Sequence, residues 1–149
     1  MPVGVGTAIA HTHGGIHVSA ALGCAAGSVL IQVGTNLAND YFDHKKGADT
    51  EDRLGPARAV QQGWISPVAM ATATVFTLSL ALAVGIYLIG LGGLPIALIG
   101  LASLVCAVAY TGGPFPLAYI GLGDVFVFLF FGLAAVVGTT WVQTLTAPP

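Results

Sequence analysis

The chain has 149 residues, of which 56% are hydrophobic and 7% charged, and its mean hydropathy is +0.90. Soluble domains carry roughly 25% charged residues, so this composition excludes an ordinary soluble domain and predicts an integral membrane protein. With 4 Lys and Arg against 6 Asp and Glu, the chain also has no basic face, which excludes nucleic acid as a partner.

Apolar stretches separated by short polar or glycine-rich segments predict an all-α fold of transmembrane helices. A hydrocarbon core about 30 Å thick needs about 20 residues of helix. Residues 1–10 are too few to span it and are expected to belong to a partial first span. Four complete spans follow, over residues 18–38, 67–89, 94–109 and 125–145. We therefore expect one polytopic helix-bundle domain over residues 1–149.

Glycines recur within the first complete span. Gly23 and Gly27 stand four residues apart, a spacing that lets helix backbones approach closely in lipid. We favour packing within one bundle over a dimer interface for this pair.

Charge is confined to one short segment. Nine of the ten charged side chains lie between Asp40 and Arg58, and the tenth is Asp124. All four Lys and Arg belong to this segment, so the positive-inside rule places the loop of about residues 40–66 in the cytoplasm. Two spans later the chain returns to the same side, which puts Asp124 there as well. Because charge beside hydrocarbon is costly, we interpret the loop as the active site of a cell-membrane protein.

Oxygen-bearing side chains cluster where the first complete span meets this loop. If the helix continues past residue 38, Asn36, Asn39, Asp40 and Asp43 fall within an arc of about 100°. Carboxylates so close repel one another unless a cation joins them. Hard oxygen ligands suit Mg²⁺, which also takes substrate phosphate oxygens, and Asp49 can fold back from the loop to join them. The sequence therefore predicts a magnesium site.

Cations follow the carboxylates. Lys45, Arg53 and Arg58 can pair with phosphate oxygens, the arginines in bidentate fashion. The alternative is a solvated loop of surface salt bridges, which contribute little energy. A substrate for such a site joins a phosphate head to a membrane-soluble body, and a lipid diphosphate is the simplest candidate.

Two stretches carry a family resemblance. The sequence NDYFD at residues 39–43, with Asp49 beyond it, resembles the first aspartate-rich motif of the UbiA prenyltransferase superfamily. Residues 36–67 and the run YTGGPFPLAYIGLGDVFVFLFFG at residues 110–132 are similar to its menaquinone-pathway branch, the 1,4-dihydroxy-2-naphthoate polyprenyltransferases.

The resemblance implies a reaction and a set of site residues. It implies Mg²⁺-dependent transfer of a polyprenyl group from polyprenyl diphosphate to the aromatic acceptor 1,4-dihydroxy-2-naphthoate, giving demethylmenaquinone. The implied metal ligands are Asn39, Asp40, Asp43 and Asp49, with Asp43, Asp49 and Arg58 as catalytic residues. The residues implied to bind the diphosphate are Lys45, Arg53, Arg58, Tyr110 and Asp124.

The sequence departs from the family in its extent. Family members have more helices and a second aspartate-rich motif, which has no counterpart here because Asp124 stands alone. We therefore expect an N-terminal-half fragment, half of a UbiA-type bundle, that does not turn over by itself. Two alternatives stay open. One is prenyl transfer to another aromatic acceptor, such as 4-hydroxybenzoate or a chlorophyll precursor. The other is a small membrane ion transporter.

Overall fold

The computed structural model describes residues 1–47, 58–114, 116–119, 121 and 123–145. Its helices are α1 (Pro2–Thr12), α2 (Val18–Lys46), α3 (Pro67–Gly92), α4 (Leu94–Ala109), α5 (Gly123–Val127) and α6 (Ala135–Thr144). A π-helical segment, η1 (Phe128–Ala134), joins α5 to α6 without a break. No β-strand occurs in these ranges, so the predicted all-α fold is confirmed.

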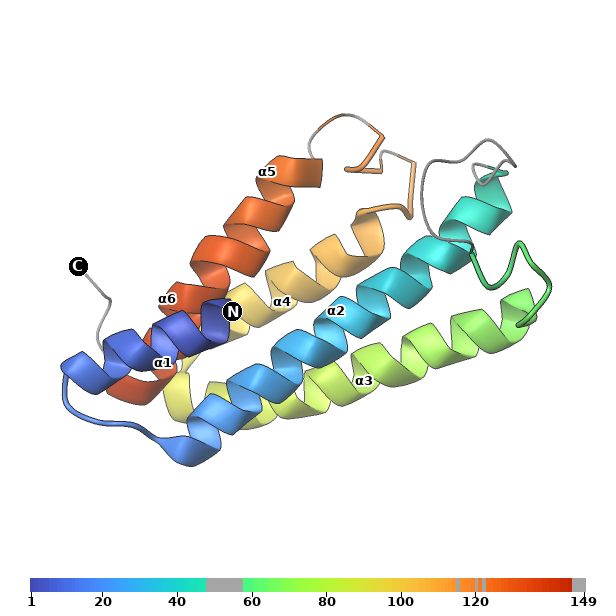
Figure 1. The fold of residues 1–149 in the computed structure, drawn as a ribbon. Coiled ribbons are helices and arrows are strands. Elements are labelled where there is room, and N and C mark those ends of the chain that lie inside the picture. Colours follow the sequence, from blue (N-terminus) through green and yellow to red (C-terminus); the bar gives the residue numbers. More distant parts are fainter. Residues whose placement is uncertain (48–57, 115, 120, 122, 146–149) are drawn as a thin grey trace.

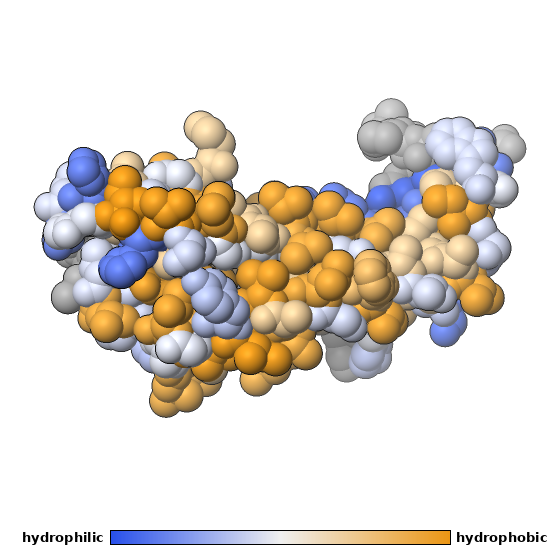
Figure 2. All heavy atoms as spheres, turned by 90° about the horizontal axis from the view of Figure 1, so that it is seen from below, coloured by the Kyte–Doolittle hydropathy of each residue, from blue (hydrophilic) through white to orange (hydrophobic). Residues whose placement is uncertain are grey.

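The helices have the length and surface of membrane spans. Among the described residues, α2, α3 and the continuous Gly123–Thr144 segment are long and apolar enough to cross a membrane. The predicted span 94–109 is indeed a helix, but its 16 residues reach only about 24 Å. Large apolar side chains such as Phe76, Leu98 and Phe128 are more than half exposed. Figure 2 shows apolar residues covering most of the middle of one face, with hydrophilic residues toward its two ends. This surface requires lipid, so the protein is integral to a membrane.

Successive long helices run antiparallel (Figure 1). α2 packs chiefly against α3, α4 returns beside α3, and α1 packs chiefly against α6. The C-termini of α2 and α4 and the starts of α3 and α5 therefore share one end of the bundle. We call it the charged end: the last two turns of α2, residues 58–66, residues 110–114 and 116–119, and the start of α5. As predicted from the number of spans between them, Asp124 lies at the same end as Asp40.

Local sequence signals set the boundaries of α2 and α3. Gly47 adopts the left-handed conformation, with φ 64° and ψ 24°, and its N–H donates to the carbonyls of Asp43 and His44. The Ser66 hydroxyl accepts from Ala69 N at 3.2 Å and caps α3. The segment predicted as a loop over residues 40–66 therefore starts with two turns of helix, and the chain leaves α2 only at Gly47.

Glycines bring α2 close to α3. A methyl group at Gly34 would lie 2.5 Å from Leu78 Cδ2, closer than van der Waals contact allows. At Gly27 it would lie 3.5 Å from Val84 Cγ1, an ordinary contact, and Gly23 also faces α3. The glycine spacing therefore serves packing within the bundle, as predicted.

Candidate functional site

The last turns of α2 carry the polar cluster at the charged end. Helix α2 continues through residue 46, which is the condition on which the predicted arc of oxygen ligands depended. Asn39, Asp40 and Asp43 are buried there, with exposed fractions of 8%, 8% and 5%, whereas Asn36 is exposed. Burial therefore separates Asn36 from the other three members of the predicted face.

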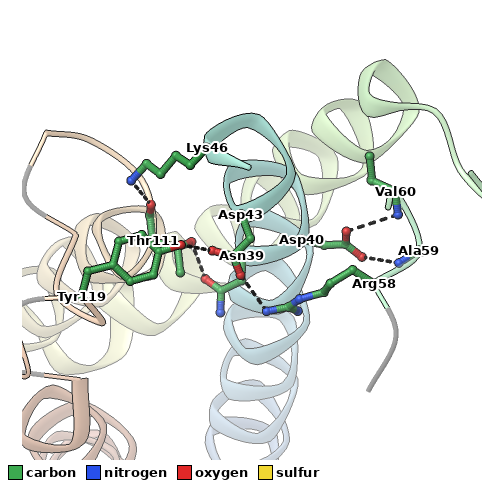
Figure 3. A network of polar contacts seen from close by, with 9 residues as sticks. All are labelled: Asn39, Asp40, Asp43, Lys46, Arg58, Ala59, Val60, Thr111 and Tyr119. Atoms are coloured by element: carbon green, nitrogen blue, oxygen red, sulfur yellow. Dashed lines mark hydrogen bonds and ion pairs between the residues drawn. The ribbon is translucent and has the colours of Figure 1, made fainter. Parts of the chain in front are cut away.

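Asp43 joins two segments that are remote in sequence (Figure 3). Its Oδ2 accepts from Arg58 Nη2 at 3.0 Å, and its Oδ1 accepts from the Tyr119 hydroxyl at 2.5 Å. Tyr119 lies 76 positions further along the chain. Hydrogen bonds to an ionised acceptor are the strong ones, so both segments are held firmly on α2.

Asp40 points to a different partner. Its Oδ2 accepts from the backbone N–H of Ala59 at 3.0 Å, and its Oδ1 accepts from that of Val60 at 3.3 Å. Figure 3 shows this carboxylate turned toward residues 59–60, away from the Thr111 side of the network. Both of its oxygens are thus engaged with backbone, and the metal role predicted for Asp40 stays a prediction.

A second connection ties α2 to the segment after α4. The Thr111 hydroxyl donates to Asn39 Oδ1 at 2.8 Å. Lys46 Nζ donates to the carbonyls of Thr111 at 2.6 Å and Gly113 at 3.3 Å, and lies 5.2 Å from the centroid of the Tyr119 ring. Lys46 therefore ties the end of α2 to the segment that follows α4.

The other predicted site residues lie outside this network. Lys45 is exposed at the end of α2. Asp124 is exposed in the first turn of α5 and makes no hydrogen bond or ion pair with any residue that the structure describes. Tyr110 lines the cavity described below. Asp49 and Arg53 fall outside the described residues, so their roles stay predictions.

Three site residues were not predicted: Lys46, Thr111 and Tyr119. All three fall within the stretches that resemble the family, and Lys46 also belongs to the charged segment, so these two signals could have pointed to it. Neither charge nor spacing distinguishes a tyrosine or threonine in residues 110–119 from its neighbours. The roles of all three residues depend on the chain after α4 folding back onto the end of α2.

An apolar cavity of about 420 Å³ lies between the helices and reaches the charged end. Most of its lining is aliphatic or aromatic, with Phe130 from η1 among the lining residues. Thr35 and Tyr110 line it too. Thr35 lies about 6 Å along α2 from Asn39, and Tyr110 directly precedes the residue that bonds Asn39. The cavity therefore adjoins the polar cluster.

The donor set at the charged end fits magnesium. Within the described ranges, no group of three or more His, Cys, Asp and Glu side chains could hold a metal ion. Asn39 and Asp43, however, are buried oxygen donors one helical turn apart. Mg²⁺ is usually bound by one or two carboxylates together with substrate phosphates and waters. These two residues therefore suit a site that the substrate completes, with Asp49 as the predicted further ligand.

Together, the fold and the site define an integral membrane protein with buried carboxylates and an arginine next to an apolar cavity. A family model adds the affiliation. The model described as "UbiA prenyltransferase family" matches residues 1–149, and the chain belongs to that family. The predicted resemblance is confirmed.

Curated relatives show the branch that the chain is similar to. It is 40% identical over 127 residues to the 1,4-dihydroxy-2-naphthoate octaprenyltransferase of Haemophilus influenzae. This match covers 81% of this chain and 41% of the relative. It is 38% identical over 151 residues to the Escherichia coli enzyme of the same name, covering 97% and 49%. The human UbiA prenyltransferase domain-containing protein 1 is 31% identical over 140 residues, covering 91% and 40%. The chain thus spans up to about half the length of these relatives. No solved structure matches it significantly.

Proposed function

We propose that this chain forms part of an enzyme that transfers a polyprenyl group from polyprenyl diphosphate to 1,4-dihydroxy-2-naphthoate in a Mg²⁺-dependent reaction. The product would be the reduced quinol form of demethylmenaquinone. The observation that carries the proposal is Asp43, buried and held by Arg58 and Tyr119 beside an apolar cavity. Relatives named for this activity support the choice of acceptor.

The position of the site favours an enzyme over the ion transporter. Transport sites usually lie near the bilayer midplane. Here the polar residues occupy the last two turns of α2, together with basic residues suited to an anionic head group. We place this end of the bundle in the cytoplasm of the cell, from the distribution of Lys and Arg.

The diphosphate head binds at the charged end in our proposal. Asn39 and Asp43, with the predicted Asp49, hold Mg²⁺, which when bound neutralises charge on the diphosphate as it leaves. Arg58 beside Asp43 contacts phosphate oxygens, and exposed Lys45 and the predicted Arg53 add positive charge. Arg58, already held by Asp43, stabilises the developing charge without reorganising during the reaction.

The polyprenyl tail occupies the apolar cavity, and the reaction takes place at its mouth. The allylic carbon–oxygen bond breaks, and its electron pair leaves with pyrophosphate. The ring carbon that bears the carboxylate attacks the allylic cation, and carbon dioxide departs. Phe126 and Phe130, which line the cavity with centroids 6.0 Å apart, help to keep water from the cation. We place Tyr110 at the mouth near the acceptor and leave Asp124 as a predicted contact.

The test is product analysis with the complete gene product in membranes. Polyprenyl diphosphate and Mg²⁺ are supplied with either 1,4-dihydroxy-2-naphthoate or 4-hydroxybenzoate, and lipid extracts are analysed by mass spectrometry. We expect prenylated, decarboxylated naphthoate, its loss in Asp43→Ala, and its retention in His44→Ala, an exposed neighbour on the same turn. Product from 4-hydroxybenzoate alone would contradict the acceptor assignment, and full activity of Asp43→Ala would contradict the site.

A further inference from the structure

Asp40 holds the backbone of the segment that returns to α2. Residues 58–64 form turns in which Gln62 N donates to Arg58 O at 3.0 Å and Trp64 N donates to Ala59 O at 3.0 Å. The first N–H groups of such a turn have no acceptor within it. The Asp40 carboxylate accepts two of them, from residues 59 and 60, and is itself 8% exposed.

This anchor determines where Arg58 lies. Arg58 directly precedes the first anchored residue, so fixing the backbone at residue 59 fixes the start of its side chain. Its guanidinium then reaches Asp43, which stands three residues after Asp40 on the same side of α2. One turn of helix thus binds the returning segment twice, by backbone through Asp40 and by side chain through Asp43 (Figure 3).

We propose that Asp40 is a positioning residue, which acts on the reaction through Arg58 and is not itself a ligand of the metal or the diphosphate. This inference rests on the proposed function for its effect on catalysis, but the anchor itself does not. A metal held by Asn39 and Asp43 would lie on the Thr111 side of the network, whereas the Asp40 carboxylate is turned away from that side toward the N–H groups of residues 59 and 60 (Figure 3), and Val60 is buried. An N–H without an acceptor is costly in a buried place, so the anchor competes with metal binding.

The first arm of the test measures whether Asp40 holds the backbone of residues 59–60, and it does not require prenyl transfer activity. Amide hydrogen exchange is measured on the complete gene product in lipid nanodiscs, comparing wild type with Asp40→Asn. The asparagine keeps the shape but offers one acceptor in place of two. In Asp40→Asn we expect amide exchange at residues 59–60 to become about tenfold faster, while exchange in α3 stays unchanged. In the control variant Asp124→Asn, exchange should stay unchanged in both regions. Unchanged exchange at residues 59–60 would overturn the anchor.

The second arm separates positioning from direct binding. Prenyl transfer is measured for Asp40→Ala, Arg58→Ala and the double variant. Each single change is expected to lower the rate about 10- to 100-fold, the range for residues that orient a ligand. The double variant should match Arg58→Ala within about twofold, because Asp40 acts through Arg58. Losses that multiply in full would show that Asp40 contacts metal or substrate directly. If wild type transfers no prenyl group, the proposed function fails while the exchange result still decides the anchor.

Discussion

The Tyr119 hydroxyl gives the sharpest single-atom test of the site. Tyr119→Phe removes the donor to Asp43 Oδ1 and leaves the aromatic ring beside Lys46 Nζ in place. At 2.5 Å this bond is in the short range of O–H groups bonded to ionised oxygen. Such bonds contribute about 1.5–3 kcal/mol net. Because Tyr119 is 51% exposed, water replaces part of this, and about 1–2 kcal/mol remains.

That energy becomes a measurable loss of metal affinity. Every 1.4 kcal/mol changes an equilibrium about tenfold, so the variant should need about 5- to 30-fold more Mg²⁺ for half-maximal prenyl transfer. The physical reason is that Asp43 loses the hydroxyl that, with Arg58, orients its carboxylate among the described residues. Prenyl transfer by the complete gene product is titrated with Mg²⁺ at saturating polyprenyl diphosphate.

Tyr41→Phe is the matched control. Tyr41 lies two residues before Asp43, and its hydroxyl makes no hydrogen bond with a residue that the structure describes. We expect its Mg²⁺ titration to overlay that of wild type within about twofold. A Tyr119→Phe curve equal to the Tyr41→Phe curve would refute the view that this hydroxyl orients Asp43.

Three further predictions concern packing, the segment after α4 and the metal. Gly34→Ala forces a methyl group against Leu78 and should lower the unfolding free energy by about 1–3 kcal/mol in a detergent melt, whereas Gly27→Ala has room and should not; equal effects would contradict the packing. Lys46→Met removes the donor to two carbonyls and should lower the unfolding free energy by about 1 kcal/mol. Lys45→Met should instead raise the KM for polyprenyl diphosphate and leave the melt unchanged. A loss of stability in Lys45→Met and a raised KM in Lys46→Met would contradict these roles. A chelator should abolish prenyl transfer and added Mg²⁺ restore it; activity that survives chelation would exclude a metal at Asn39 and Asp43.

Sequence reasoning was most successful where local chemistry decides structure. The apolar runs predicted the helices because a chain in lipid must satisfy its backbone hydrogen bonds internally. The predicted span over residues 67–89 begins at Pro67, where α3 begins, whereas α2 continues beyond the predicted residue 38 to Lys46. Helical periodicity also placed Asp43 and Asn39 on one face of the helix, and the structure shows that both are buried.

The partners of these residues could not be predicted because they depend on how two connections fold back. Periodicity grouped Asn36 with Asn39, yet only the packed bundle shows that Asn36 is exposed. Motif resemblance grouped Asp40 with the metal ligands, yet the structure gives its oxygens to two backbone N–H groups. Tyr119 reaches Asp43 only because residues 116–119 return across the end of α2.

The most direct test of the account is photolabelling with a polyprenyl diphosphate that carries a diazirine on its tail, using the complete gene product in lipid nanodiscs. With Mg²⁺ present, we predict labels on cavity-lining residues such as Phe130 and Thr35. Labelling should vanish with chelator or in Asp43→Ala and persist in His44→Ala. Labels on the lipid-facing surface alone, or cavity labels that survive the loss of both Mg²⁺ and Asp43, would contradict a head group held at Asp43 with its tail in this cavity.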